Sequence, residues 1–146
     1  MDSDALFTDM TFELPWDRYA QYNLILSGSS EKVYNDKNWL GLNTGIFLLR
    51  NCQWSLDLLD ALAPMGPKGP VRDDAGKCIA EFLSNRPVFE ADDQSALVYL
   101  LVMQRDKWDE KIYFEGAYNL HTDWSIATEK YEEMIDNFHP GLGDWR

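Results

Sequence analysis

Two aspartates near the start of the chain, Asp2 and Asp4, have a spacing that could bind a metal ion. In an extended backbone, alternate side chains point to the same side, so both carboxylates can face one cation. Hard divalent cations favour oxygen ligands, and a bound cation can neutralise the charge that develops on a diphosphate leaving group. A solvated turn would have the same composition, so both interpretations of the triplet stay open.

A second acidic cluster spans residues 90–94 and reads Glu-Ala-Asp-Asp-Gln, directly before an apolar stretch. Asp92 or Asp93 could accept hydrogen bonds from the free backbone N–H groups at the start of a helix. The same carboxylates could instead stabilise positive charge on a sugar carbon, or attack it, as carboxylates do in retaining glycoside chemistry. Composition alone fits both helix capping and catalysis.

Asn43, Thr44 and Gly45 form a short polar run that predicts a turn. Glycine permits close approach of a ligand to the backbone, and Asn and Thr can bond sugar hydroxyls, although an ordinary turn explains the run equally. His121, near Trp124, fits either a ligand-binding or a structural histidine. The 6 tryptophans could include flat platforms for sugar faces, or they could all belong to the core.

The composition indicates one folded, acidic domain. A chain of 146 residues has an ordinary length for one domain, and 45% of its residues are hydrophobic, including 6 Trp and 7 Phe. That content argues against disorder. A net charge of −12 predicts repulsion from nucleic acids and anionic membranes, so we expect no nucleic-acid partner. The acidity fits both cation recruitment and plain solubility.

Neither cysteine chemistry nor a membrane span is predicted. Cys52 and Cys78 lack the CxxC spacing of a zinc or thioredoxin-like site, and we expect no disulfide between them. The longest apolar run, Ala96–Met103, is much shorter than the roughly 18 residues of a transmembrane helix. We therefore expect this piece to be soluble, whatever anchors a longer parent protein.

Alternating strands and helices must position these residues, and they indicate an α/β fold. Apolar runs predict strands at Asn23–Leu26 and Lys111–Phe114, and a strand-like region at Trp39–Arg50 that contains the apolar run Ile46–Leu49. Periodicity, acidic starts and proline or basic ends predict a helical turn at Ala5–Phe12 and helices at Gln53–Leu62, Arg72–Ser84, Asp92–Arg105 and Glu129–Phe138. Polar or proline-rich composition predicts loops at Ser27–Asn38 and Pro64–Pro70.

Taken together and in order, these pieces resemble glycosyltransferase family 34, which includes plant xyloglucan xylosyltransferases and galactomannan galactosyltransferases. The likeness covers nearly the whole chain, and its longer strings are far more specific than a bare D-x-D match. The strings are DSDALFTDM (Asp2–Met10), LNTGIFLLRNCQW (Leu42–Trp54), SLDLLDALAPMGPKG (Ser55–Gly69), RPVFEADDQSALVYL (Arg86–Leu100) and YEEMIDNFHPGLGD (Tyr131–Asp144).

The resemblance implies a GT-A fold, an α/β catalytic domain with a nucleotide-binding half and an acceptor half. Residues 1–146 would be the acceptor-side half from the D-x-D motif onward, without the N-terminal nucleotide-binding half and without the H-F-x-G-C-K-P segment that follows in the family. The family uses Mn²⁺ and a UDP-sugar, retains anomeric configuration, and adds one sugar to O6 of a β-1,4-linked cell-wall glycan. We therefore expect a UDP-sugar donor, a β-1,4-glycan acceptor and Mn²⁺.

The resemblance also assigns roles to matched positions near both ends of the chain. Asp2, Ser3 and Asp4 would bind the nucleotide, with Asp2 and Asp4 as the metal ligands. His121 would contact substrate, although Leu120–Trp124 lacks the glycine of the family's L-H-G-x-W motif.

The central motifs receive roles at the sugar. The family's A-D-D-Q motif makes Asp92, Asp93 and Gln94 the catalytic residues. Either aspartate would stabilise positive charge at the anomeric carbon, and Gln94 would orient the sugar or its acceptor. The L-N-T-G motif would contact substrate through Asn43, Thr44 and Gly45.

The donor sugar and the setting are further expectations from the resemblance. The amino-acid sequences of Arg50–Trp54 and Pro64–Pro70 favour galactosyl transfer, with xylosyl transfer as the alternative. The parent would be a single-pass type II Golgi membrane protein with a lumenal catalytic domain, alone or in oligomers with other Golgi glycosyltransferases. The competing hypothesis is a non-catalytic truncated remnant that binds glycan or a partner glycosyltransferase. A generic cation-binding domain ranks last, because the chain has no EF-hand loop.

Overall fold

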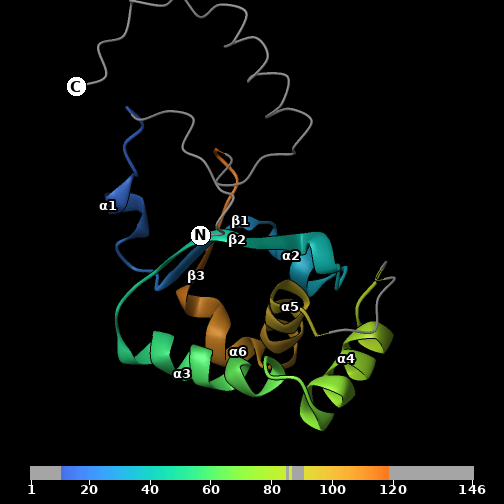
Figure 1. Ribbon diagram of the computed structural model, residues 1–146. Helices are drawn as coiled ribbons and strands as arrows, with labels where there is room; N and C mark the ends of the chain where they lie inside the picture. Colours follow the sequence, from blue (N-terminus) through green and yellow to red (C-terminus); the bar gives the residue numbers. More distant parts are fainter. Residues whose placement is uncertain (1–10, 85, 87–90, 119–146) are drawn as a thin grey trace, which may run out of the picture.

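A three-stranded mixed sheet lies at the centre of the computed structural model, which describes residues 11–84, 86 and 91–118 (Figure 1). The strands β1 (Leu24–Gly28), β2 (Leu42–Leu49) and β3 (Ile112–Glu115) follow the order β2-β1-β3. The central strand β1 is antiparallel to β2 and parallel to β3. Parallel strands need a long crossover, and here the chain between β2 and β3 supplies the helices. The predicted α/β class is therefore confirmed.

Helices α3 to α6 lie on one side of the sheet, and α1 lies on the other (Figure 1). On the α1 side, the rings of Tyr19 and Tyr22 contact the ring of Tyr113, with centroids 5.5 and 5.0 Å apart. The α-helices in the described part of the chain are α1 (Trp16–Tyr19), α2 (Ser30–Tyr34), α3 (Gln53–Leu62), α4 (Pro70–Phe82), α5 (Asp93–Met103) and α6 (Arg105–Trp108). Short 3-10 turns span Trp39–Gly41, Ala63–Met65 and Asp109–Lys111.

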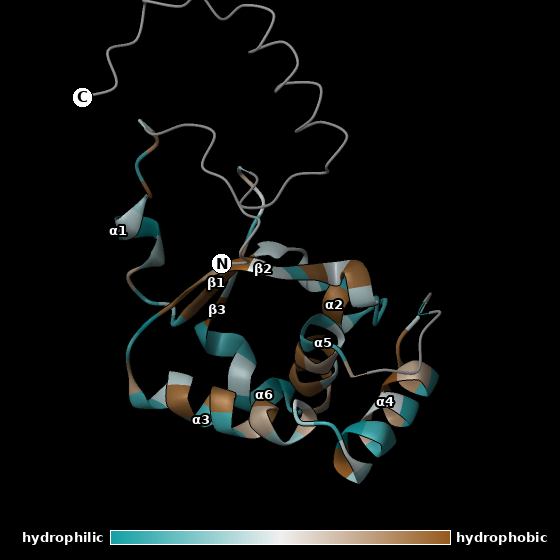
Figure 2. Ribbon diagram, viewed as in Figure 1, coloured by the Kyte–Doolittle hydropathy of each residue, from teal (hydrophilic) through white to brown (hydrophobic). Residues whose placement is uncertain are grey.

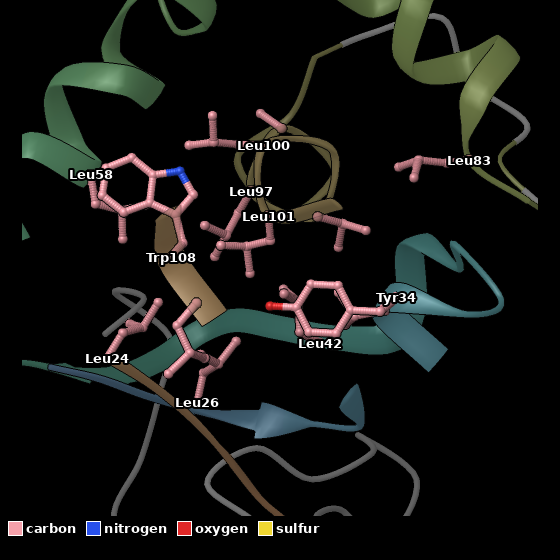
Figure 3. Packing of buried hydrophobic residues seen from close by; sticks show 14 of the residues in the cluster. Leu24, Leu26, Tyr34, Leu42, Leu58, Leu83, Leu97, Leu100, Leu101 and Trp108 are labelled. Carbon is pink, nitrogen blue, oxygen red and sulfur yellow. The ribbon is translucent and has the colours of Figure 1, made fainter. Parts of the chain in front are cut away.

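The hydrophobic core fills the space between the sheet and the helices (Figure 3). Alternate strand residues point to the same face, so Leu24 and Leu26 of β1 both face the helices. Helix α5 is apolar on nearly all sides (Figure 2), which is typical of a helix surrounded by other elements. Trp108 closes one end of the core and packs edge-on against Trp54, with ring centroids 5.5 Å apart.

A close backbone approach joins the end of β1 to the start of β2. A Cβ atom on Gly28 would lie 2.7 Å from the carbonyl oxygen of Gly41, and a Cβ atom on Gly41 would lie 2.9 Å from the Val33 side chain. Ser29 N–H donates to that same Gly41 oxygen over 2.8 Å. The two glycines therefore bring β2 close enough to pair with β1.

The predicted loop at Ser27–Asn38 is wrong at its centre, where α2 forms. The Ser29 side chain caps this helix by accepting a hydrogen bond from Lys32 N–H, and Val33 and Tyr34 are buried in the core. Two apolar residues within a polar stretch are too short a pattern to indicate a helix, so tertiary packing decides the conformation.

The predicted turn at residues 43–45 is also wrong, because all three residues lie inside β2. Leu42 pairs with Gly28 and Phe47 pairs with Leu26, so β2 carries extra residues across this interval. Such an irregularity bends a strand without reversing it, and it changes the direction of the side chains it contains. Small and polar residues therefore marked a bulge rather than a turn.

The other predicted elements match the structure closely. The strands and α3 form where predicted, α4 begins two residues early at Pro70, and α5 ends at Met103. Cys52 and Cys78 are both free thiols, as expected. The helix predicted at Glu129–Phe138, and most of the helical turn at Ala5–Phe12, lie outside the described residues. Within the described residues, no helix is both long and apolar enough to cross a bilayer.

Candidate functional site

The bulged start of β2 meets the N-terminus of α5, and this contact brings two of the predicted motifs together. Thr44 Oγ1 donates a hydrogen bond to Asp93 Oδ2 over 2.7 Å. Asp93 is the first residue of α5, and its side chain is exposed. We call the group formed by Asn43, Thr44, Asp92, Asp93 and Gln94 the carboxylate site. Its two halves are 49 positions apart in sequence at the Thr44–Asp93 contact.

Asp92 is the N-cap of α5, as its capping interpretation predicted. Its Oδ1 accepts a hydrogen bond from Ser95 N–H over 2.8 Å, and its Oδ2 lies 2.6 Å from Nη2 of Arg86. Burial opposes ionisation of Asp92, but the hydrogen bonds from Ser95 and the Arg86 contact outweigh it, so the pKa of this carboxyl lies below its ordinary value. Both oxygens are therefore already engaged by the protein.

Gln94 holds the start of α5 against the turn that precedes β2. Its Nε2 donates to the carbonyl oxygen of Trp39 over 3.0 Å. The Arg86 guanidinium lies over the Trp39 ring, 5.7 Å from its centroid. The first turn of α5 is thus fixed by contacts from β2, from the Trp39 turn and from Arg86.

Asn43 and Gly45 shape the bulge rather than forming a free turn. Asn43 Oδ1 accepts a hydrogen bond from Gly45 N–H over 2.8 Å. Side-chain bonds of this kind satisfy backbone donors that an irregular strand leaves unpaired. This local bond fixes the backbone around Thr44, whose side chain reaches Asp93.

Two hollows meet at Asp93. The smaller has a volume of about 190 Å³ and is walled mainly by leucines of β1, α3 and α5, with Asn43, Thr44 and Asp93 as its polar residues. The larger has a volume of about 640 Å³ and contains Arg72, Asp92 and Asp93 beside an apolar wall. The Asp93 carboxylate is therefore the negative charge that the two hollows share, and a positive centre bound between them would lie beside it.

The part of the chain that the structure describes does not include the residues predicted to hold a metal. Asp2, Ser3 and Asp4, together with His121, lie outside the described residues. Across residues 11–84, 86 and 91–118, no group of three or more His, Cys, Asp or Glu side chains could hold a metal ion. Asp92 is engaged by Ser95 and Arg86, so the carboxylate site does not fit a cation site by itself.

Sequence reasoning missed Arg86 and the role of Trp39. In the sequence, Arg86 is only the first residue of a matching string, and Trp39 is only one of 6 tryptophans. The available signal was the position of a basic residue shortly before an acidic cluster. That signal is weak, because the spacing does not say which carboxylate the guanidinium reaches.

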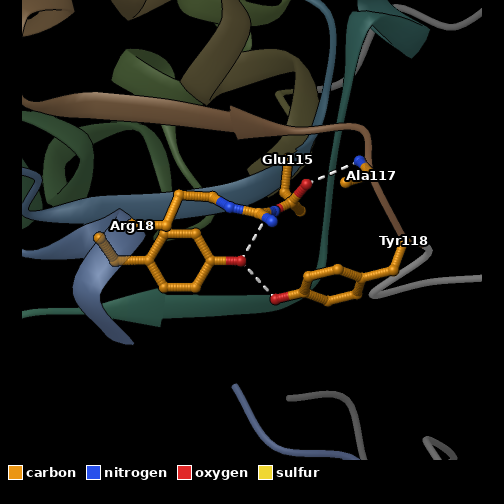
Figure 4. A network of polar contacts seen from close by, with 5 residues as sticks. Arg18, Glu115, Ala117 and Tyr118 are labelled. Atoms are coloured by element: carbon orange, nitrogen blue, oxygen red, sulfur yellow. Dashed lines mark hydrogen bonds and ion pairs between the residues drawn. The ribbon is translucent and has the colours of Figure 1, made fainter. Parts of the chain in front are cut away.

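A second polar network, also missed, lies on the opposite face of the sheet (Figure 4). The Glu115 side chain is buried, and it accepts hydrogen bonds from Arg18 Nη1 at 2.9 Å, Tyr19 OH at 2.5 Å and Ala117 N–H at 2.6 Å. Tyr19 OH also shares a hydrogen bond with Tyr118 OH. Burial opposes ionisation of Glu115, yet these donors outweigh it and hold its pKa below the ordinary value. The network tethers α1 to the end of β3.

Comparison with known proteins identifies the family. The sequence pattern described as the galactosyl transferase GMA12/MNN10 family matches residues 1–146, the whole chain. The chain belongs to this glycosyltransferase family. The resemblance to glycosyltransferase family 34 is therefore confirmed. The carboxylate site is built from residues within two of its matching strings.

Curated relatives of the family align along the full 146 residues. The chain is 66% identical to probable xyloglucan 6-xylosyltransferase 1 of Oryza sativa subsp. indica and 65% identical to xyloglucan 6-xylosyltransferase 2 of Arabidopsis thaliana. It is 60% identical to probable glycosyltransferase 2 of Oryza sativa subsp. indica. The matched region is 33%, 32% and 30% of these relatives, so the chain spans about a third of their length.

Proposed function

We propose that this chain supplies the sugar-side part of a glycosyltransferase that moves xylose from a UDP-sugar to O6 of a β-1,4-linked cell-wall glucan. The observation that carries the proposal is the Thr44–Asp93 contact, which holds an exposed carboxylate between two hollows. The family match and the names of the relatives support glycosyl transfer to a cell-wall glycan. The fold would be part of a GT-A domain, which the mixed α/β sheet is consistent with.

The side chains of the carboxylate site have separate tasks in this proposal. Asp93 would face the anomeric carbon and stabilise the positive charge that develops there as the donor bond breaks. Thr44 would hold the Asp93 carboxylate in one orientation before the sugar binds. Gln94, bonded to the Trp39 carbonyl oxygen, would keep the first turn of α5 in place beside the acceptor. The leucines of the smaller hollow would exclude water from the reacting centre.

The donor nucleotide and Mn²⁺ are proposed to bind at Asp2, Ser3 and Asp4. A divalent ion would supply charge neutralisation for the diphosphate leaving group. Retention of configuration, a lumenal position in the Golgi and assembly with other glycosyltransferases belong to the same proposal. Their support is the family match alone.

We propose xylose rather than galactose as the transferred sugar. This replaces the expectation of galactosyl transfer that the sequences of Arg50–Trp54 and Pro64–Pro70 favoured. The relatives at 65% and 66% identity carry xylosyltransferase names, whereas the family description refers to galactosyl transferases. Both donors therefore belong in the test.

The test incubates the purified chain with Mn²⁺, a cello-oligosaccharide and either UDP-xylose or UDP-galactose. We expect the oligosaccharide to gain one pentose, with an α-1,6 linkage visible by NMR. D93N should reduce transfer by about 100-fold, because removal of one preorganised electrostatic group typically costs that much. D60N, which changes an exposed aspartate of α3, is the matched control.

Two other outcomes would reject this proposal. Transfer that D93N leaves intact would show that the carboxylate site is not where the chemistry occurs. Retention on a β-1,4-glucan column, with no transfer and no change of melting temperature on addition of Mn²⁺ and UDP, would favour the non-catalytic glycan-binding remnant.

A further inference from the structure

Arg86 makes the most deeply buried charged contact of the carboxylate site. Its side chain is 2% exposed, whereas that of its partner Asp92 is 40% exposed. The 2.6 Å distance from Nη2 to Asp92 Oδ2 indicates a strong, charge-assisted hydrogen bond. The guanidinium also lies over the Trp39 ring.

Burying a guanidinium is costly unless a counter-charge and hydrogen bonds offset the loss of water. The fold places this charge where it can reach a residue of the A-D-D-Q motif, although a surface position would avoid the cost. One oxygen of Asp92 pairs with the Arg86 guanidinium, and the other accepts the capping hydrogen bond from Ser95 N–H. The Asp92 carboxylate is therefore held from two sides, which leaves it badly placed to meet a sugar.

We propose that Arg86 is a positioning residue of the carboxylate site, which acts through Asp92 to fix the first turn of α5, and that Asp93 alone is the reacting carboxylate. This inference rests on the proposed function for its catalytic part. Its structural part, the effect of Arg86 on Thr44 and Asp93, stands on the contacts alone.

Three contacts from three segments converge on one helical turn. Arg86 holds Asp92, Thr44 holds Asp93, and the Trp39 carbonyl oxygen accepts from Gln94. Successive residues of a helix point in different directions, so each contact restrains a different side of the turn. Loss of the Arg86 contact would let the turn shift, and a shift of the order of 1 Å is enough to slow a reaction strongly.

The decisive experiment is a double-mutant cycle with R86A, D92N and the R86A/D92N pair, measured as kcat and KM for the donor. We expect each single variant to lower kcat by about tenfold and the pair to lose no more than either alone, because both act through one contact. R86K should recover part of the loss, since it keeps the charge but not the planar fork. D93N should lose about 100-fold.

A matched control and a second readout separate positioning from simple loss of stability. K77A breaks an ion pair on α4 whose side chains are 68% and 74% exposed, and it should leave kcat unchanged. In ¹⁵N–¹H NMR spectra recorded well below the melting temperature, R86A and D92N should shift the amide signals of Thr44 and Gln94, while K77A should not.

The outcomes are distinguishable. If D92N costs as much as D93N and adds to R86A, then Asp92 reacts directly and the inference is overturned. If R86A leaves the Thr44 and Gln94 signals in place, the positioning role is overturned whatever the kinetics show. If no variant and no wild-type chain transfers sugar, the proposed function and its assignment of Asp93 fail, and the NMR shifts alone still decide the role of Arg86.

Discussion

Thr44 and Asp93 are joined by a hydroxyl–carboxylate hydrogen bond that links the bulged part of β2 to the first turn of α5. Hydrogen bonds to an ionised acceptor are stronger than neutral ones, but water competes for an exposed carboxylate. The bond should therefore contribute little to the stability of the fold. Its main effect is on the orientation of Asp93.

Replacement of Thr44 by Val tests whether the hydrogen bond orients Asp93 more than it stabilises the fold, because Val keeps the shape of the side chain and removes the donor. We expect the free energy of unfolding to fall by no more than about 1 kcal/mol. Transfer should fall by about tenfold, since the carboxylate loses its fixed orientation. Urea unfolding and initial rates measure the two effects. T44S retains the hydroxyl and is the control; equal rates for T44V and T44S would contradict the assignment.

The sequence predicts all five members of the carboxylate site but not the contacts between them. Asp92 and Asp93 are the same residue type at adjacent positions, so sequence alone offered capping and catalysis to both. The structure separates them, because Arg86 contacts Asp92 and Thr44 donates to Asp93. The Thr44–Asp93 contact depends on how segments 49 positions apart fold together, and the Arg86–Asp92 contact depends on which carboxylate a nearby guanidinium reaches; local patterns encode neither.

Helix α1 is only one turn long, so its own hydrogen bonds cannot hold it in place. Glu115 supplies the missing support by accepting hydrogen bonds from Arg18 and Tyr19. The aromatic contacts of Tyr19 and Tyr22 with Tyr113 add apolar packing on the same face. One buried carboxylate and three rings thus help to hold this short helix, together with Arg50, whose Nη2 donates to the carbonyl oxygens of Tyr19 and Ala20.

Acidification should weaken this tether. The pKa of Glu115 is depressed in the folded protein, so its stabilising effect is present above the unfolded carboxyl pKa of about 4.3 and is lost as pH falls through the folded value. E115Q should be less stable at pH 7 by about 1–3 kcal/mol, because its hydrogen bonds from Tyr19 and Ala117 lose an ionised acceptor. As pH falls below about 4.3, the free energy of unfolding of E115Q should decrease less than that of the wild type.

Urea unfolding at a series of pH values between 7 and 3 measures both effects. E81Q, a change at an exposed glutamate of α4, is the control and should follow the wild type. If stability depended on pH in E115Q as it does in the wild type, the hydrogen bonds to Glu115 would not lower the pKa of its carboxyl group, which contradicts this prediction.

The junction of β1 and β2 makes a separate prediction. A Cβ atom at Gly28 would lie 2.7 Å from the Gly41 carbonyl oxygen, and backbone cannot move aside as a side chain can. We expect G28A to destabilise the protein by about 1–3 kcal/mol, the usual range for overpacking. G116A is the control, because a Cβ atom there would contact nothing within 4 Å. Equal melting temperatures for the two variants would contradict the close approach.

Element prediction from sequence succeeded where the pattern was long and failed where it was short. The apolar faces of α3 and α4 and the uniformly apolar α5 gave clear signals over ten or more residues. Helix α2 has only five residues, and the bulge in β2 resembles a turn in composition. Both depend on packing across the sheet, where tertiary contacts outweigh local propensity.

At the scale of the whole molecule, α5 is the element that joins the core to the carboxylate site. It contacts α2, α3, α4, α6 and β2. Its N-terminal residues Asp93 and Gln94 belong to the site, while Leu101 near its other end is fully buried. Stability and site geometry should therefore be coupled through this helix.

Truncation of Leu101 to Ala should lower the free energy of unfolding by about 2–5 kcal/mol, because it removes buried methyl groups and leaves a cavity. Far-UV circular dichroism and tryptophan fluorescence should report the same shifted midpoint, since α5 contacts most other elements. M103A, at a site 55% exposed, should change stability by less than about 0.5 kcal/mol. Separate midpoints for the two signals would contradict a single cooperative core.

The central position of β1 has a consequence for synthesis on the ribosome. Its partner β2 comes next along the chain after α2 and the Trp39–Gly41 turn, so that antiparallel pair can close before α3 is translated. Leu24 pairs on its other side with Ile112, so the second edge of β1 stays open until α3 to α6 have all been translated. During that interval an apolar strand edge is available to wrong partners, which makes the nascent chain most vulnerable to aggregation just before β3 emerges.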